Sequence, residues 1–179
     1  MSDIIAAVST GRVVSAIGIV RLSGAGSIPL AFSVFTPRGQ ATAKTVEDRK
    51  LILGALHDRQ GRIIDEAMLT VSRAPHSYTG EDTAEFHCHG SPAVLSAALE
   101  ALFAKGARQA GPGEFTKRAF LNGRMDLTQA EAVIDLIEAE SAEAAANAAG
   151  QLGGAMGKKI TTVYDRLTDV LAHFHAELD

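Results

Sequence analysis

Apolar residues in the first half of the chain form short runs separated by polar or glycine-containing turns. Residues 4–8 and 17–22 are rich in Ile, Val and Ala, which is typical of buried strands. Gly24 and Gly26 then precede a more helical stretch that ends near Phe35. The pattern therefore predicts two strands followed by a helix.

The next apolar runs predict a hairpin, a further strand and a longer helix. Residues 50–57 and 63–72 flank a polar loop that ends in Gly61, an arrangement typical of two antiparallel strands. Residues 84–89 favour another strand. Residues 92–104 predict a helix, because a proline suits its first turn and a glycine lies just beyond its end. Together these elements indicate a mixed α/β unit.

After Gly111 the pattern becomes helical. Pro112 suits the start of a short helix that runs through Phe120. Asp126 and Gln129 have the spacing of an N-cap and its reciprocal partner, because each side chain can bond a free backbone N–H of the first turn. Apolar residues then recur at helical spacing, at Leu127, Ala130, Val133, Ile134 and Ile137.

A second apolar stripe continues almost to the last residue, at Ile160, Val163, Tyr164, Leu167, Val170, Leu171, Phe174 and Leu178. Residues 150–157, which join the two stripes, are compatible with a loop, but we expect one long helix through them at a cost of ~1 kcal/mol per glycine. Because the stripe ends without a cap, we expect the chain to be truncated. A boundary within residues 116–123 gives a first domain at residues 1–118 and a helical segment at residues 119–179.

Composition narrows the class of protein without indicating a function. Hydrophobic residues make up 46% and charged residues 21%, as in soluble globular proteins. The net charge of −4 excludes a basic surface over the whole chain, so we expect only weak binding of RNA. The one cysteine, Cys88, rules out an internal disulfide, and no apolar run approaches the ~20 residues of a membrane span. These features favour a cytoplasmic protein.

Two short motifs resemble known sites. The first lacks residues that its site requires, and the second cannot direct its side chains toward one ion. Residues 153–159 resemble a phosphate-binding loop, yet Leu152 stands where a glycine is needed and Lys159 where Ser or Thr is needed. We therefore expect no GTP hydrolysis by this chain. Residues 87–89, His-Cys-His, are zinc-type ligands, but on a strand the two histidines face one side and the cysteine the other. We therefore expect no metal site and assign no catalytic residue.

Three charged residues interrupt otherwise apolar or turn-like segments. Arg21 lies within an apolar strand, Glu85 lies among strand residues, and Arg124 lies between an Asn-Gly pair and the N-cap at Asp126. A charge on a half-buried element needs a partner or a ligand, because an isolated buried charge is costly. Periodicity leaves two interpretations open: Glu85 pairs with an arginine, or these charges form a binding site.

Three stretches carry a resemblance to a known family: AIGIVRLSG at residues 16–24, SYTGEDTAEFHCHG at 77–90, and PGEFTKRAFLNGRMDLTQAEAVIDLI at 112–137. In this order, and almost without gaps, they resemble the N-terminal region of the MnmE family, also called TrmE. Members of that family are GTPases that modify the wobble uridine of certain tRNAs. The resemblance covers nearly the whole chain, and its last block is the most specific part.

The resemblance implies an α+β fold: a mixed-sheet domain that binds tetrahydrofolate and dimerises, related in fold to the aminomethyltransferases of glycine cleavage, then an all-α helical segment. In the family, a GTPase domain that uses GTP, Mg²⁺ and K⁺ is inserted into the helical domain. GTP hydrolysis would drive rearrangement of a homodimer, while 5-formyltetrahydrofolate donates one carbon to U34 of tRNA alongside a flavin-dependent partner, MnmG. This chain contains no such GTPase sequence, so we expect it only to bind folate, with dimerisation left open.

By motif match, the resemblance implies that Arg21, Glu85 and Arg124 contact folate. A carboxylate can accept from the ring N–H and amino group of a pterin, and an arginine matches the carboxylates of the glutamyl tail. We expect Glu85 to meet the pterin, while the sequence does not say which arginine meets which end. The chain departs from the family where residues 9–12 replace Pro-Pro-Gly, where Ser91 replaces a glycine, and where Arg124 replaces a common lysine.

Two other functions stay open at this point. One is a free-standing folate-dependent aminomethyl or methyl transferase, which the kinship in fold permits. The apolar stripe that reaches the end of the chain argues against it, because an independent enzyme should cap or bury that helix. The other is a structural dimerisation module with a vestigial pocket.

Overall fold

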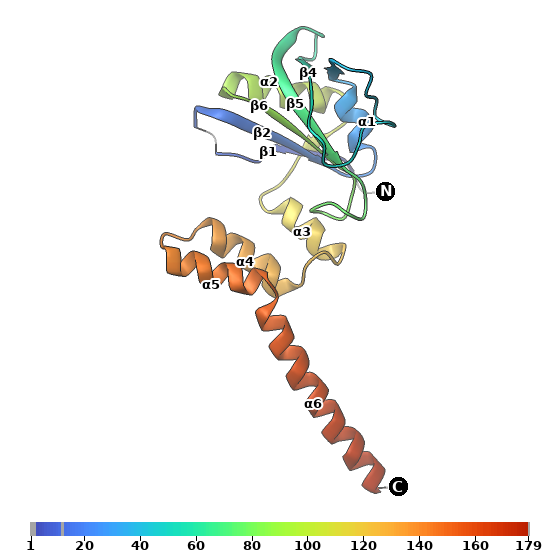
Figure 1. The fold of residues 1–179 in the computed structure, drawn as a ribbon, viewed down its shortest axis with the longest axis vertical. Helices are drawn as coiled ribbons and strands as arrows, with labels where there is room; N and C mark the ends of the chain where they lie inside the picture. The colour runs from blue at the N-terminus through green and yellow to red at the C-terminus, as the bar shows by residue number, and fades with distance from the viewer. Residues whose placement is uncertain (1–2, 12, 179) are drawn as a thin grey trace. The chain divides into compact units, whose positions relative to one another are not determined.

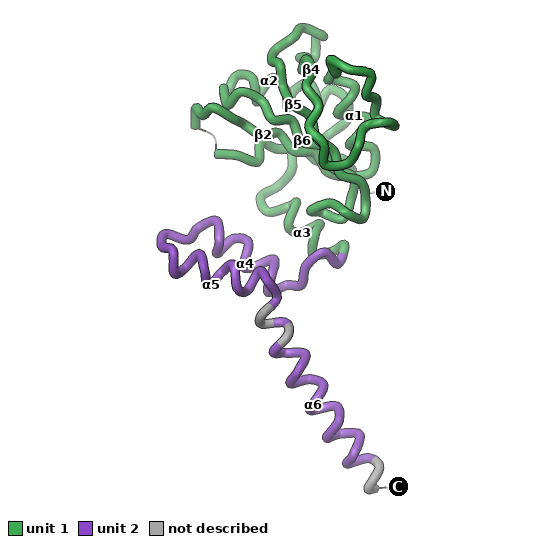
Figure 2. Tube along the Cα trace, viewed as in Figure 1, with its two compact units in different colours: residues 1–122 green, residues 123–179 purple. Residues whose placement is uncertain are grey.

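A computed structural model describes residues 3–11 and 13–178, apart from the side chains of residues 155, 156, 158 and 176–178. The chain divides into two compact units, residues 1–122 and 123–179 (Figure 2). This division lies within the predicted boundary region, residues 116–123. Arg12, part of the departure from the family pattern, lies outside the described residues, as does Asp179.

The first unit is built on a mixed β-sheet (Figure 1). In the described residues seven strands pair in the order β3-β4-β5-β6-β2-β1-β7, and all neighbours are antiparallel except β1 and β7. The strands are β1 (Ile5–Val8), β2 (Ser15–Ser23), β3 (Phe35–Pro37), β4 (Ile52–His57), β5 (Ile63–Ser72), β6 (Thr83–Gly90) and β7 (Arg108–Gln109). The fold of this unit is α+β, as predicted.

Helices α1 (Ser27–Phe32) and α2 (Pro92–Ala104) pack on one face of this sheet. Strand side chains alternate between faces, so every second residue of β2, β5 and β6 enters the core. The core contains, among others, Ala31, Leu95, Ala98 and Leu102 of the helices and Val20, Leu22, Leu69, Ala84 and Phe86 of the strands. Side chains at the intervening strand positions therefore lie on the opposite face.

Most predicted elements of this unit are confirmed, with one correction. The two early strands, the hairpin, the strand at residues 84–89 and the helix at residues 92–104 are all present. The helix expected to end near Phe35 instead ends at Phe32. Phe35 begins β3, where its ring is buried against Phe86 of β6. Burial against a distant strand therefore outweighs the local helical pattern.

Helix α3 (Glu114–Leu121) closes the first unit, and the second unit contains α4 (Leu127–Ile137), α5 (Ala142–Leu152) and α6 (Ala155–Leu178). The predicted cap of α4 is confirmed: Asp126 Oδ1 accepts from the Gln129 backbone N–H at 2.8 Å, and Gln129 Oε1 accepts from the Asp126 N–H at 2.9 Å. These bonds satisfy donors that the first helical turn leaves unpaired.

The prediction of one long helix through residues 150–157 is wrong. Helix α5 ends at Leu152 and α6 starts at Ala155. Gly154 has φ of 79°, a left-handed conformation that glycine adopts without steric cost. Gln129 of α4 donates to the free carbonyl of Leu152 at 2.7 Å. A contact from another helix thus stabilises the break.

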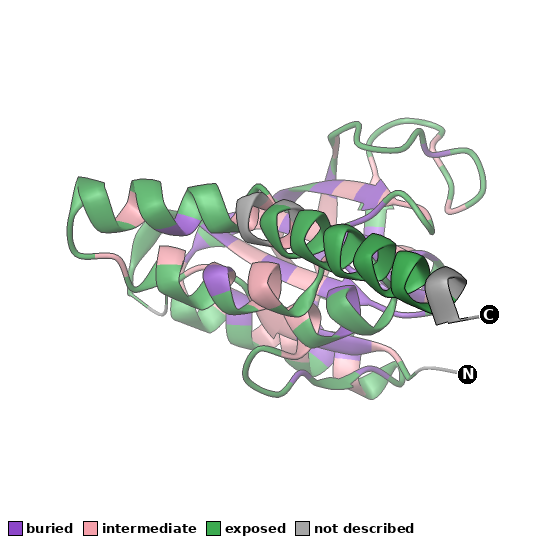
Figure 3. Ribbon diagram, turned by 90° about the horizontal axis from the view of Figure 1, so that it is seen from below, coloured by how far each residue is buried: buried purple, intermediate pink, exposed green. Residues whose placement is uncertain are grey.

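The described apolar side chains of α6 are exposed, and Figure 3 shows this helix coloured as exposed over most of its length. They include Ile160, Val163, Tyr164, Leu167, Val170, Leu171 and Phe174. The side chain of Leu178, the last member of the predicted stripe, lies outside the described residues. Among the helices described, none combines the length and apolar character needed to cross a membrane.

Candidate functional site

The sheet face opposite α1 and α2 carries the charged residues singled out by the sequence. On β6, Ala84, Phe86 and Cys88 are buried in the core, whereas Glu85 and His87 point to the other face and are half-buried. Burial raises the pKa of the Cys88 thiol to about 12, so this cysteine is a neutral core residue. The alternation separates Cys88 from the histidines on either side of it.

Arg21 and Glu85 meet on this face. They are directly opposite each other on the neighbouring strands β2 and β6, and Arg21 Nε donates to Glu85 Oε1 at 2.7 Å. About a quarter of each side chain is exposed, 27% for Arg21 and 25% for Glu85. The interpretation that Glu85 pairs with an arginine therefore describes this structure, and the pair still has an edge accessible from solvent.

Two aromatic rings flank the Arg21 guanidinium. Its central carbon lies 5.5 Å from the ring centroid of Tyr78 and 5.6 Å from that of Phe115, both within cation–π range. Tyr78 lies in the loop between β5 and β6, and Phe115 lies on α3. The hydroxyl of Tyr78 and that of Thr116 are 2.9 Å apart, which ties the loop to the helix. The rings hold the guanidinium in place beside Glu85.

The second carboxylate oxygen of Glu85 is less engaged. His87 Nε2 lies 3.6 Å from Glu85 Oε2, beyond hydrogen-bond distance. Within the described residues, His87 Nε2 is the buried side-chain polar atom that lacks a hydrogen-bond partner. His89, the next residue on this face of β6, differs: its Nδ1 lies 2.7 Å from Asp65 Oδ1, and this bond raises the pKa of His89.

A pocket of about 320 Å³ opens beside Glu85 and His87. The side chains that line it come from β5, β6 and the segment that leads into β4: Arg49, Leu51, Thr70, Val71, Ser72, Thr83, Glu85 and His87. A carboxylate, an imidazole, a guanidinium and several hydroxyls thus border one cavity that also has apolar walls. Polar groups that converge on one cavity can fix the orientation of a small ligand.

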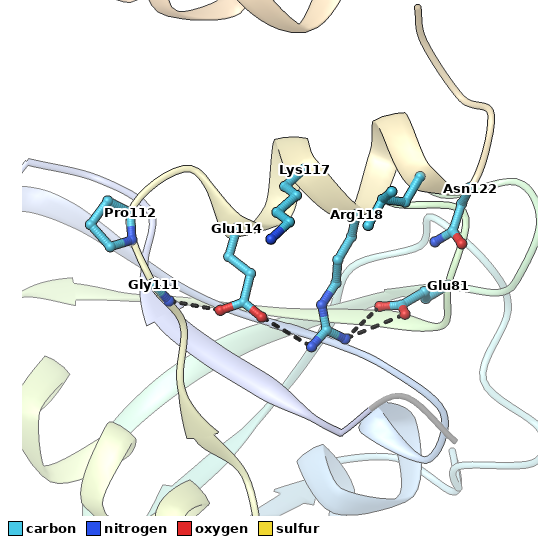
Figure 4. Close-up of a pocket in the computed structure, with 8 residues that line it drawn as sticks. Glu81, Gly111, Pro112, Glu114, Lys117, Arg118 and Asn122 are labelled. Carbon is cyan, nitrogen blue, oxygen red and sulfur yellow. Dashed lines mark hydrogen bonds and ion pairs between the residues drawn. The ribbon is translucent and has the colours of Figure 1, made fainter. Parts of the chain in front are cut away.

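A larger hollow, about 580 Å³, lies beside α3, but its charged groups are largely bonded to one another. Figure 4 shows the Arg118 guanidinium between Glu114 and Glu81. Arg118 also donates to the main-chain carbonyl and the side chain of Asp3, at 2.9 and 2.7 Å. Only 10% of its side chain is exposed. This cluster anchors α3 and the β5–β6 loop to the start of the chain.

Arg124, the third predicted folate contact, belongs to the second unit and is exposed. The first unit supplies Arg21 and Glu85 without it, so the role of Arg124 stays a prediction. Sequence analysis missed Tyr78, Phe115 and His87 as members of the site. The two aromatics lie within the stretches SYTGED and PGEFTKR that carry the resemblance, and an aromatic beside conspicuous charges is the signal that could have identified them.

Comparisons with known proteins match both parts of the chain. Residues 4–124 match a family described as the GTP-binding protein TrmE N-terminus, and residues 127–179 match the MnmE helical domain. The chain is 49% identical to a tRNA modification GTPase MnmE of Thermus thermophilus, over 100% of this chain and 41% of that protein. It is 45% identical to the proteins of the same name from Synechococcus sp. strain JA-3-3Ab and Carboxydothermus hydrogenoformans, over 100% of this chain and 39% of each.

The chain thus spans about two fifths of the length of these curated relatives. All three carry the name of a tRNA modification GTPase, which favours that class over a free-standing transferase.

Proposed function

Because the chain belongs to the MnmE (TrmE) family of tRNA modification GTPases, we propose that its sheet domain binds a reduced folate on the face that carries Arg21 and Glu85. The ligand is 5-formyltetrahydrofolate, the one-carbon donor for modification of the wobble uridine, U34. One observation carries this proposal: in the region that matches the family's N-terminal domain, Arg21 pairs with Glu85 and lies between two aromatic rings, and Glu85 borders a pocket.

The carboxylate of Glu85 suits the donor edge of a pterin. A pterin presents a ring N–H and an amino group side by side, and a carboxylate can accept both as a charge-assisted pair. Glu85 Oε1 already accepts from Arg21, but each carboxylate oxygen has a second lone pair. The bond to Arg21 also fixes the orientation of the Glu85 carboxylate. The pair is therefore compatible with a bound ligand.

Tyr78 and Phe115 complete the proposed site in the first unit. The two aromatic rings offer apolar surfaces against which a flat heterocycle can stack. Because Arg21 is engaged by Glu85, we assign Arg21 to the pterin end of the ligand. A folate contact of Arg124 stays an expectation from the family resemblance.

We extend the same proposal to a protein of the length of the curated relatives, of which the chain spans about two fifths. The sheet domain would then share its fold kinship with the aminomethyltransferases of glycine cleavage and form the homodimer contact. A GTPase domain that uses GTP, Mg²⁺ and K⁺ would drive rearrangement of the dimer in the cytoplasm, with MnmG as partner and tRNA as substrate. The names of the relatives support the GTPase and tRNA modification parts of this extension.

Titration calorimetry with 5-formyltetrahydrofolate tests the site. Glu85→Gln places an NH₂ against a ligand donor, so affinity should fall ~10-fold or more, since a charge-assisted bond contributes ~1.5–3 kcal/mol. Glu66→Gln is the matched control, because Glu66 lies on β5 outside the pocket and pairs with Arg38. Circular dichroism must show that each variant is folded. If folded Glu85→Gln protein binds as tightly as the parent, Glu85 serves only its structural pair with Arg21.

A further inference from the structure

One member of the pocket has no role in the function proposed so far. The imidazole of His87 borders the pocket beside Glu85, two residues along β6 and on the same face. Its Nε2 is buried without a hydrogen-bond partner within the described residues. Such an unsatisfied atom is costly in a folded protein and calls for a partner that the protein alone does not supply.

We propose that His87 is a specificity-determining residue of this site, and that its Nε2–H donates to the 4-oxo group of the bound pterin. This inference rests on the proposed function, because it requires that a pterin occupies the pocket. It goes beyond that function by assigning recognition of a second group on the ligand, one that Glu85 cannot bind.

The order of polar atoms in the site matches the edge of a pterin. That edge presents an acceptor, the 4-oxo oxygen, then a donor, the ring N–H, then a second donor, the amino group. Glu85 presents two acceptors, and His87 presents one nitrogen 3.6 Å from Glu85 Oε2. This spacing suits two groups that bind neighbouring atoms of a flat ring rather than each other. The donor of His87 and the two acceptors of Glu85 therefore complement the acceptor and two donors of the ligand edge.

The surroundings of His87 favour a proton on Nε2. If Nε2 lacked its proton, its lone pair would face the negative oxygen of Glu85, whereas an N–H at this position is attracted to it. The side chain of His87 is 30% exposed, so part of it already faces solvent. Because rotation about the Cβ–Cγ bond is soft, a small turn of the ring brings Nε2 to a ligand in the pocket while it stays beside Glu85.

A pair of ligands separates recognition of the 4-oxo group from other contacts. One is 5-formyltetrahydrofolate, and the other is its analogue with an amino group at position 4, which reverses the first two groups of the edge. The parent protein should prefer the 4-oxo ligand. His87→Ala should bind the 4-oxo ligand ~5- to 10-fold more weakly and leave the affinity for the 4-amino analogue unchanged, which narrows the preference.

Two further variants separate hydrogen bonding from a structural effect. His87→Gln keeps an N–H donor and should retain most of the parental preference for the 4-oxo ligand. His57→Ala is the matched control, because His57 lies on β4, contacts Thr36 and does not line the pocket. It should leave both affinities unchanged. Circular dichroism and urea unfolding must show that all variants have the parental fold.

The possible results distinguish the two proposals. If His87→Ala keeps the parental affinities for both ligands while Glu85→Gln loses binding, the role of His87 is wrong and the folate site stands. If the parent protein does not bind 5-formyltetrahydrofolate, both proposals are wrong. Guanosine presents the same edge of one acceptor and two donors, so it serves as the remaining probe. Guanosine binding as tight as that of the folate would overturn the assignment to a pterin.

Discussion

Two arginines of the sheet domain are held in opposite ways. Arg118 is nearly buried, and its guanidinium bonds Glu81, Glu114 and both the side chain and the main chain of Asp3. Arg21 is about a quarter exposed, bonds one oxygen of one carboxylate, and packs between two aromatic rings. Arg21 lies on β2 and Arg118 on α3, and their surroundings differ in how completely each charge is satisfied.

This difference separates an anchor from a candidate binding site. A buried guanidinium that already bonds several carboxylates is held for the fold, and removing it leaves unpaired buried charges. A partly exposed pair, one member of which borders a pocket, still has lone pairs for a ligand. The number of unused polar groups, more than the presence of a charge, therefore marks the candidate site.

The largest expected effect tests the anchor. Arg118→Met should destabilise the protein by about 3–5 kcal/mol, because the largely buried carboxylates of Glu81 and Glu114 then lose a shared cation. Urea unfolding at pH 7 measures the change. Arg38→Met is the control, since both Arg38 and its partner Glu66 are at least half exposed, and it should change stability by less than about 1 kcal/mol. Equal losses of stability on the two substitutions would show that Arg118 contributes no more to the fold than an exposed arginine.

The second prediction concerns the site. Glu85→Gln should weaken 5-formyltetrahydrofolate binding ~10-fold or more while the free energy of unfolding changes by less than about 1 kcal/mol, as for other partly exposed ion pairs. Calorimetry and urea unfolding on the same preparations give both values. A large loss of stability with no separate loss of binding would place Glu85 with Arg118 as an anchor.

The third prediction uses pH to probe the anchor. Hydrogen bonds from Arg108 lower the pKa of Glu114 to about 2 from its ordinary value of 4.5. A lowered pKa in the folded state gives stability that is present above pH 4.5 and is lost as pH falls toward 2. Glu114→Gln should therefore cost about 1–2 kcal/mol near pH 6, a value reduced for solvent screening. The difference from the parent should shrink between pH 4.5 and pH 2 in unfolding curves. A difference that is constant with pH would contradict this cause.

The smallest expected loss of stability comes from a substitution of Arg21. Arg21→Met removes a partly exposed cation but keeps the length of the side chain, so it should cost less than about 1 kcal/mol of stability. Thermal unfolding measures this change in the absence of ligand. With 5-formyltetrahydrofolate present, the parent should gain more thermal stability than the variant. If Arg21→Met destabilises as much as Arg118→Met, the two arginines have the same structural role.

The sequence alone determined most of the elements and the positions of two site residues. Period-two and helical patterns located the hairpin, the strand at β6 and helix α2, because local spacing records which side of an element is buried. The cap of α4 was predictable for the same reason, since Asp126 and Gln129 lie within one turn. Arg21 and Glu85 were identifiable as charges on apolar strands.

Only the tertiary structure decided which partners these residues contact. Arg21 and Glu85 are 64 positions apart and meet because β2 and β6 pair in a particular register. Arg118 and Asp3 are 115 positions apart, and no local pattern links them. The break between α5 and α6 likewise depends on Gln129 of another helix. Spacing along the chain encodes which face of an element is buried, whereas the partner of a charge depends on strand register and on loops that bring distant segments together.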